Sequence, residues 1–108
     1  MTLIKAAVCR EPKTDLTIEE IRLSDPEQDE IRVTVEACAI CHSDITYIDG
    51  GWSIGYPVVL GHEVSGKIAE IGPETETELS IGDQVVVSLI RTCGQCLACK
   101  RGHDVACT

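Results

Sequence analysis

Apolar and polar residues alternate most regularly from Ile31 to Ala37, with apolar side chains on one face and charged residues or Thr on the other. This period of two is typical of a β-strand with one buried face. The run at residues 16–23 also alternates, but it slips at Glu19-Glu20, which indicates a β-bulge. Further apolar runs predict strands at residues 3–8, 64–71 and 85–89, the last of them long enough to be a buried strand.

The hydrophobic period changes after Cys41. Ser43 or Asp44 is expected to cap a short helix that runs to about Ile48, and Gly50-Gly51 ends it. Cys41 would then lie near a helix N-terminus, where the positive end of the helix dipole favours a thiolate. These elements together predict a mainly β chain with short helices.

Composition limits the possible partners. The 108 residues are enough for one domain. A net charge of −9 argues against binding to nucleic acid or to an anionic membrane surface. No apolar run approaches the ~20 residues of a membrane helix, and the first residues lack the apolar stretch of a signal peptide.

The chain contains seven cysteines. Their odd number, the C-x2-C spacings and the missing signal peptide indicate metal binding in a reducing cytosol, so the expected location is cytoplasmic. Cys9 and Cys38 lie outside the two candidate sites described below. Both are predicted to be buried as small hydrophobic residues.

Four thiols fall within fifteen residues, in the pattern Cys93-x2-Cys96-x2-Cys99-x7-Cys107. Four thiolates at ~2.3 Å form a closed, structural zinc site. The bacterial iron–sulfur pattern has three residues before its last cysteine and a proline after it, whereas seven residues and Thr108 stand here. Structural zinc is therefore favoured, and an iron–sulfur cluster and disulfides stay open as alternatives.

A second constellation combines Cys41 and His62 with the nearby polar residues Ser43, Asp44 and Glu63. A catalytic zinc has three protein ligands and one open position. A lone Cys and a lone His about twenty residues apart more often serve as core filler and as a structural histidine. The neighbouring groups change this balance, because an Asp can hydrogen-bond the far nitrogen of a ligand imidazole and a Ser hydroxyl can pass a proton.

The motifs Cys41-His42-Ser43-Asp44, Gly61-His62-Glu63 and Gly82-Asp83-Gln84-Val85 precede the four cysteines in that order. Together they resemble the zinc-dependent alcohol dehydrogenases of the medium-chain dehydrogenase/reductase family. The resemblance implies that residues 1–108 are the N-terminal part of a GroES-like catalytic domain, a partly open β-barrel with short helices and a four-cysteine zinc lobe. It also implies a Rossmann domain for NAD(P) after residue 108, since no G-x-G-x-x-G fingerprint is present.

The resemblance also implies roles for individual residues. Cys41 and His62 would bind the catalytic zinc, with Glu63 behind the metal and able to approach it. Asp44 would steady His62, and Ser43 would hydrogen-bond the alcohol and begin the exit of its proton.

The remaining roles that the resemblance implies concern the cofactor, the substrate and the second metal. His42 would reach the cofactor pyrophosphate, and Trp52 would line the substrate pocket. A structural zinc would be held by Cys93, Cys96, Cys99 and Cys107.

Two departures from the family pattern matter for activity. Thr46 stands where many relatives have a His that ends the proton relay, and the remaining protein ligand of the catalytic zinc would follow residue 108. We therefore expect the chain alone to be inactive, and the complete protein to be a homo-oligomer acting on a small alcohol or aldehyde. The alternatives are a medium-chain dehydrogenase of polyols, threonine or glutathione adducts, a zinc-binding module without catalysis, and a GroES-like co-chaperonin.

Overall fold

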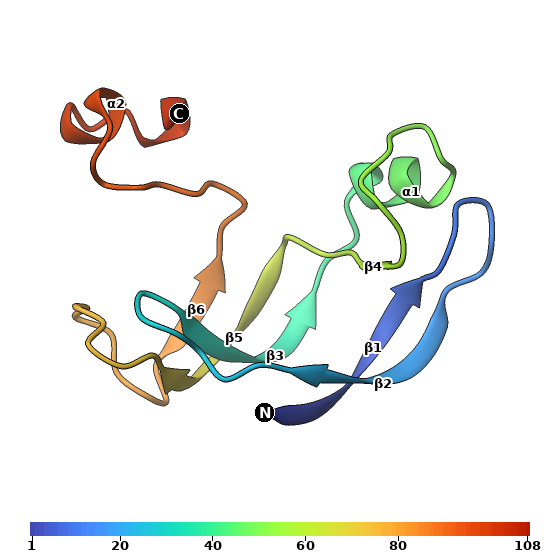
Figure 1. Ribbon diagram of the computed structural model, residues 1–108, viewed down its shortest axis with the longest axis horizontal. Helices are drawn as coiled ribbons and strands as arrows, with labels where there is room; N and C mark the ends of the chain where they lie inside the picture. The colour runs from blue at the N-terminus through green and yellow to red at the C-terminus, as the bar shows by residue number, and fades with distance from the viewer.

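A computed structural model of residues 1–108 contains two antiparallel sheets of three strands each (Figure 1). The first sheet has the order β2-β1-β4, with bounds Thr17–Leu23, Thr2–Cys9 and Val58–Val59. The second has the order β3-β5-β6, with bounds Ile31–Cys38, Val64–Ile71 and Gln84–Val87. The predicted mainly β architecture is confirmed.

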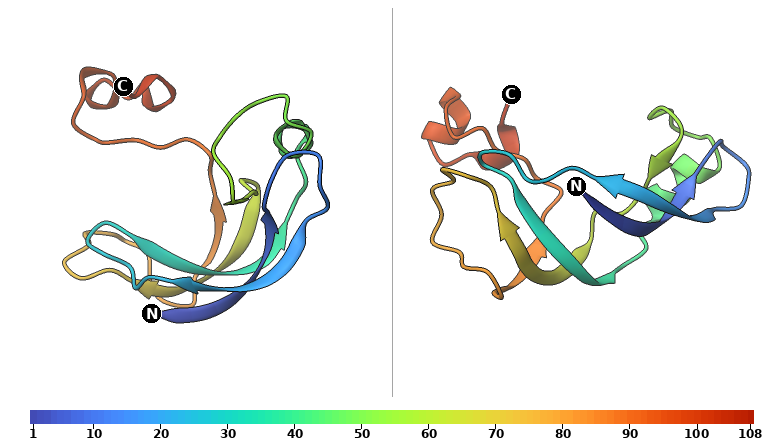
Figure 2. Two further views of the ribbon diagram at one scale, coloured as in Figure 1. Left: turned by 45° about the vertical axis from the view of Figure 1, so that its right-hand side comes forward. Right: turned by 60° about the horizontal axis from the view of Figure 1, so that its bottom comes forward.

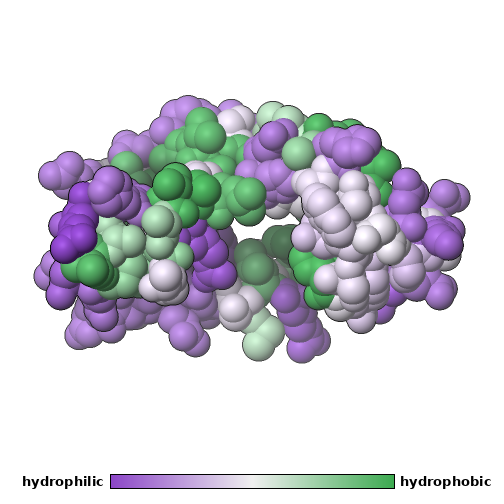
Figure 3. All heavy atoms as spheres, turned by 90° about the horizontal axis from the view of Figure 1, so that it is seen from above, coloured by the Kyte–Doolittle hydropathy of each residue, from purple (hydrophilic) through white to green (hydrophobic).

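The helices lie on two arms that rise from the sheets (Figures 1 and 2). One arm carries α1 (His42–Ile48), and the other carries α2 (Leu97–Lys100) and the 3-10 helix η1 (Asp104–Ala106). None of these helices could cross a bilayer, since the longest has only 7 residues. Seen from above, the molecule is hollowed between the arms, and apolar residues lie at the back of the hollow (Figure 3).

The bulge predicted at Glu19-Glu20 is wrong. Strands β1 and β2 pair in unbroken register, with Glu19 opposite Ala6 and Glu20 opposite Lys5. The slip in the apolar pattern instead places Ile18, which is 73% exposed, on the face opposite to Ile21. Register shifts occur in the β3–β5 pair, between Arg32 and Val33 and between Val35 and Ala37.

Two predictions of burial are also wrong. Strand β6 is an edge strand that pairs only with β5, so Val86 is 80% exposed and Leu89 beyond it is 66% exposed. Cys9 is fully buried as expected, but Cys38 at the end of β3 is exposed. Its sulfur lies against Gly61, where a Cβ would come within 2.9 Å of it at a φ of +131°, so this position requires glycine.

The two sheets are joined by the side chain of Arg32, which is 12% exposed. Its Nη1 donates to Thr2 Oγ1 at 2.9 Å and to Glu70 Oε1 at 3.0 Å, and its Nη2 donates to the Ser24 carbonyl at 2.6 Å and to Asp25 Oδ1 at 3.3 Å. A planar guanidinium with several donors can satisfy these acceptors together, whereas an ammonium cannot reach all of them.

We expect Arg32→Lys to lower the free energy of unfolding by roughly 1–3 kcal/mol, because charged hydrogen bonds between the sheets are lost. Urea unfolding of the chain checks this value. Arg22→Lys, on the exposed edge strand β2, is the matched control and should change stability little. Equal stability of the two variants would contradict a joining role for Arg32.

Candidate metal centres

The first turn of α1 places the thiol of Cys41 at the helix N-terminus. The N-cap residue is Cys41, so the prediction that Ser43 or Asp44 occupies the cap is wrong. Asp44 stands instead at the third helical position, where its Oδ2 accepts a hydrogen bond from the backbone N–H of Cys41 at 3.0 Å. A carboxylate at this position satisfies a free helix N–H and interacts favourably with the positive end of the helix.

The imidazole of His62 lies against the same turn. Its Nε2 is 3.5 Å from Ser43 Oγ, and its Nδ1 is 3.6 Å from Asp44 Oδ1. Asp44 is only 8% exposed, so its carboxylate is shielded from water where it faces the ring. The buried Asp44 carboxylate thus contacts both the N-terminus of α1 and the His62 ring.

Thiol and imidazole influence each other's protonation. The pKa of Cys41 is lowered by hydrogen bonds with the Ser43 side chain and backbone and with His62. The pKa of His62 is raised, chiefly by its hydrogen bond with Cys41. The thiol is therefore biased toward the thiolate, which is the form that binds metal.

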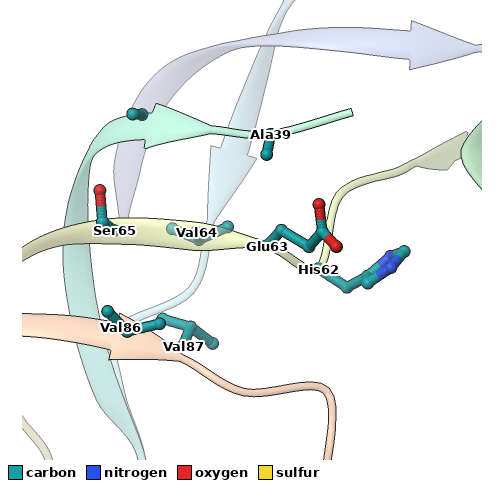
Figure 4. Close-up of a pocket in the computed structure, with 8 residues that line it drawn as sticks. Ala39, His62, Glu63, Val64, Ser65, Val86 and Val87 are labelled. Atoms are coloured by element: carbon teal, nitrogen blue, oxygen red, sulfur yellow. The ribbon is translucent and has the colours of Figure 1, made fainter. Parts of the chain in front are cut away.

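Glu63 supplies a third ligand atom. The ligand atoms of Cys41, His62 and Glu63 all lie within 4.8 Å of one another. The side chains of His62 and Glu63, the two residues before β5, project beyond the end of that strand (Figure 4). The backbone of Glu63 is held by a 2.9 Å hydrogen bond from the Ala39 N–H to the Glu63 carbonyl. One sulfur, one nitrogen and one carboxylate form a donor set that suits zinc and leaves a fourth position open.

The four cysteines of the other arm also converge. Their sulfur atoms lie within 4.8 Å of one another, and those of Cys93 and Cys99 are 4.0 Å apart. Tetrahedral zinc with bonds of ~2.3 Å places its sulfurs about 3.8 Å apart, so the cluster fits zinc closely. All seven cysteines are free, so the disulfide alternative is not observed.

Backbone N–H groups favour the thiolate form of two of these cysteines. The Cys99 N–H, first among several donors, lowers the pKa of Cys96 to about 6, and the N–H groups of Gln95 and Cys96 lower that of Cys93. The Cys93 N–H lowers the pKa of Cys107, but the hydrogen bonds with the Cys99 and Cys93 thiols and burial raise it by more. The net result is a pKa of about 11 for Cys107. Four thiolates therefore require a positive charge at their centre.

Three other candidate residues stand apart from these clusters. His42 is exposed at the first helical position, and Trp52 is 54% exposed. The hydroxyl of Thr46 donates to the His42 carbonyl at 3.2 Å, so it is engaged within α1. The third histidine of the chain, His103, is exposed and is not among the four converging ligands.

His62 lies where two grooves meet. The larger, of about 810 Å³, is lined by the end of β2, by β3, by Val87 at the end of β6, and by Leu89 and Arg91 beyond it. The smaller, of about 360 Å³, lies over Ser65 and the exposed Val86 (Figure 4). The sequence pattern missed Val87 and Leu89 as neighbours of the site because it placed them in a buried strand; their position directly before the four cysteines was the available signal.

Comparison with known proteins adds independent information. The family model described as "Alcohol dehydrogenase GroES-like domain" matches residues 27–108. The geraniol dehydrogenase of Castellaniella defragrans is 38% identical over 103 residues, which are 95% of this chain and 27% of that protein. The chain thus spans little more than a quarter of this relative.

Solved structures give the same result. The crystal structure of benzyl alcohol dehydrogenase from Acinetobacter calcoaceticus superposes with a TM-score of 0.92 at 38% identity, covering 100% of this chain and 29% of that one. An alcohol dehydrogenase from E. coli CFT073, complexed with NADH, has a TM-score of 0.82 at 32% identity, covering 99% of this chain and 31% of that one.

Proposed function

Since the chain belongs to the alcohol dehydrogenase GroES-like domain family, we propose that it provides the zinc-binding part of the active site of an NAD(P)-dependent alcohol dehydrogenase. The expected GroES-like fold is confirmed by the family match and the superposition, and membership of this family sets the co-chaperonin alternative aside. The observation that carries the proposal is the convergence of Cys41, His62 and Glu63, with Ser43 beside His62.

Cys41 and His62 would hold the catalytic zinc, and Glu63 would occupy a third position or leave it during ligand exchange. Zinc bound there would lower the pKa of an alcohol hydroxyl toward neutrality, and a nicotinamide cofactor would accept the hydride from carbon. Ser43, whose Oγ lies 3.5 Å from His62 Nε2, would accept a hydrogen bond from the alcohol hydroxyl and, as it takes up that proton, release its own to water. Asp44 holds the His62 ring in place through the nitrogen that Ser43 does not face.

The rest of the active site would lie in the part of the relatives that this chain does not match. We propose a dinucleotide-binding domain there, with His42 directed toward the cofactor pyrophosphate and Trp52 toward the substrate. The four-cysteine cluster would hold a structural zinc, because four thiolates would fill all four coordination positions and leave none for a substrate.

The proposal is tested with the protein that carries this chain, by following NADH or NADPH formation from a primary alcohol. We expect oxidation that a zinc chelator abolishes and added zinc restores. Cys41→Ser should remove this activity and the catalytic zinc, while the structural zinc stays bound. Undiminished oxidation by a Cys41→Ser protein that has lost this zinc would contradict the proposal.

Metal stoichiometry in the isolated chain gives a further prediction. We expect one zinc to survive dialysis, held by the four cysteines, and a second to bind more weakly, because Cys41, His62 and Glu63 leave it open to water. Elemental analysis and competition with a coloured chelator measure the two sites.

Glu63→Gln is the informative variant for this stoichiometry. It should weaken only the second zinc, since Glu63 is distant in sequence from the four thiols and belongs to the other cluster. Two zinc ions retained with equal strength, or bound iron with visible colour, would contradict the assignment of the two sites.

A further inference from the structure

Two separate segments of the chain supply the ligands of the Cys41 site. Cys41 lies at the start of α1, whereas His62 and Glu63 lie between β4 and β5. Near the ligands the side-chain contacts between the segments are long: Ser43 Oγ is 3.5 Å from His62 Nε2, and Asp44 Oδ1 is 3.6 Å from His62 Nδ1. Both distances exceed the roughly 2.7–3.2 Å of an ordinary hydrogen bond to nitrogen, so shorter contacts elsewhere are needed to fix how the two segments lie.

One such contact joins the same two segments at the far end of α1. The Tyr56 hydroxyl donates to the Tyr47 carbonyl at 2.6 Å. Tyr47 belongs to the last turn of α1, where carbonyls lack a helical partner four residues on, and its carbonyl also accepts from the Gly50 N–H at 3.1 Å. Tyr56 lies two residues before β4, so its hydrogen bond holds the segment that leads to His62 against the helix that begins after Cys41.

The chain between Tyr56 and His62 is itself held in place by the first sheet. Strand β4 lies between these two residues and pairs with the end of β1, where Val8 and Cys9 are buried. A strand that is hydrogen-bonded to a buried neighbour opens rarely. A restraint on Tyr56 therefore also restrains the start of the segment that carries His62.

The turn between β1 and β2 provides a second tie to the end of α1. The Lys13 N–H donates to the Ile48 carbonyl at 2.6 Å. Gly50 lies against Pro12 in the same turn, so closely that a Cβ on Gly50, whose φ is +79°, would come within 3.1 Å of the Pro12 Cβ. Because α1 has only 7 residues, fixing its last carbonyls also fixes the direction in which its first turn presents Cys41.

We propose that Tyr56 is a positioning residue of the Cys41 site, and that its hydroxyl keeps α1 and the His62 segment in the arrangement that binds metal. The backbone bond between Ala39 and Glu63 holds the chain before the helix, and the Tyr56 hydroxyl holds it after the helix. Without the Tyr56 bond, some molecules would hold Cys41 and His62 too far apart, and metal affinity would fall with the fraction in the binding arrangement. This inference rests on the proposed function for its metal site, but it requires no alcohol oxidation.

Cobalt(II) is the probe, added to the protein that carries this chain while zinc stays at the four cysteines. Cobalt accepts the same ligands as zinc, and its visible absorption reports their geometry. Tyr56→Phe removes only the hydroxyl, so we expect the cobalt dissociation constant of the Cys41 site to rise roughly three- to tenfold, the equivalent of one hydrogen bond, and its spectrum to change. Cys41→Ser should abolish this cobalt signal and so assigns it to the site.

Tyr47→Phe is the matched control for Tyr56→Phe. It makes the same chemical change on the residue whose carbonyl accepts the bond, at a hydroxyl that has no partner within the chain. Cobalt affinity and spectrum should be those of the unmodified protein. Elemental analysis of the zinc at the four cysteines, which should be unchanged in both variants, shows that each has folded.

The second tie gives an independent variant. Gly50→Ala places a methyl group against Pro12 and should loosen the Lys13 bond to α1, so it should also weaken cobalt binding. Gly82→Ala is its control, since Gly82 has a similar φ of +93° but no atom within 4 Å of an added Cβ. If Tyr56→Phe loses the zinc of the four cysteines and has therefore misfolded, this pair decides: equal cobalt binding by the two variants would overturn the proposal.

The remaining outcomes separate this proposal from the proposed function. Unchanged cobalt affinity and spectrum in Tyr56→Phe would overturn the positioning role, and so would an equal loss in Tyr47→Phe. If the protein binds cobalt at Cys41 but oxidises no alcohol, the proposed function fails, and the cobalt comparison still decides the role of Tyr56. If the unmodified protein binds no cobalt at Cys41, both proposals fail.

Discussion

Replacing Cys96 with serine is expected to release the tightly held zinc and to lower the melting temperature of the chain sharply. Four-thiolate sites contribute an apparent ~10 kcal/mol or more to folding in small zinc peptides. That is comparable with the roughly 5–15 kcal/mol that stabilises a typical domain. The arm with α2 and η1 is built around these sulfurs and has no buried residue, so little else would hold it together.

Thermal unfolding with and without a chelator measures this effect. Chelation should bring the unmodified chain close to the melting temperature of Cys96→Ser and should hardly change the variant itself. Cys38→Ser is the matched control, since this exposed thiol lies outside both clusters. A larger loss of stability in Cys41→Ser than in Cys96→Ser would reverse the assignment of structural and catalytic sites.

In the complete protein, Ser43→Ala is expected to reduce kcat by about 10²–10⁴-fold, the usual contribution of a positioned group that transfers a proton. The zinc content should be unchanged, because Ser43 is not among the converging ligands. Ser43→Thr keeps a hydroxyl in the same place and should retain activity. Steady-state kinetics on zinc-replete protein provide the measurement.

The competing explanation gives Ser43 only a structural role at the helix terminus. The structure weakens this explanation, because the N-cap is Cys41 and the capping carboxylate belongs to Asp44. Thr46→Val removes another hydroxyl of α1, one that is bonded to the His42 carbonyl, and should leave kcat nearly unchanged. A near-normal kcat in Ser43→Ala would remove this residue from the proton's path.

Sequence spacing was sufficient to predict the four-cysteine cluster. Its ligands are close neighbours along the chain, so a few tight turns bring the sulfurs together whatever the rest of the fold does. The Cys41 and His62 pair depends on two segments about twenty residues apart. Its prediction therefore needed the family resemblance as well as the residue types.

The burial of individual residues was less predictable. Val86 and Cys38 have apolar or small side chains, but their exposure depends on which strand lies beside them. Strand β6 has a partner on one edge only, and hydrophobicity along the chain does not reveal this. The 2.6 Å hydrogen bond from the Tyr56 hydroxyl to the Tyr47 carbonyl of α1 was missed for a related reason. A tyrosine that donates to a backbone carbonyl has no sequence signature.

The carboxylate of Asp44 links the start of α1 to the orientation of the His62 ring, so the two cannot change independently. Its Oδ2 accepts from the Cys41 N–H, and its Oδ1 faces Nδ1 of His62. Any replacement at this position alters the start of the helix and the angle of the imidazole in the same step. Variation in the metal preference of such a protein is therefore expected to arise at Glu63, which is exposed and free of this double constraint, while the site around Asp44 changes only through paired substitutions.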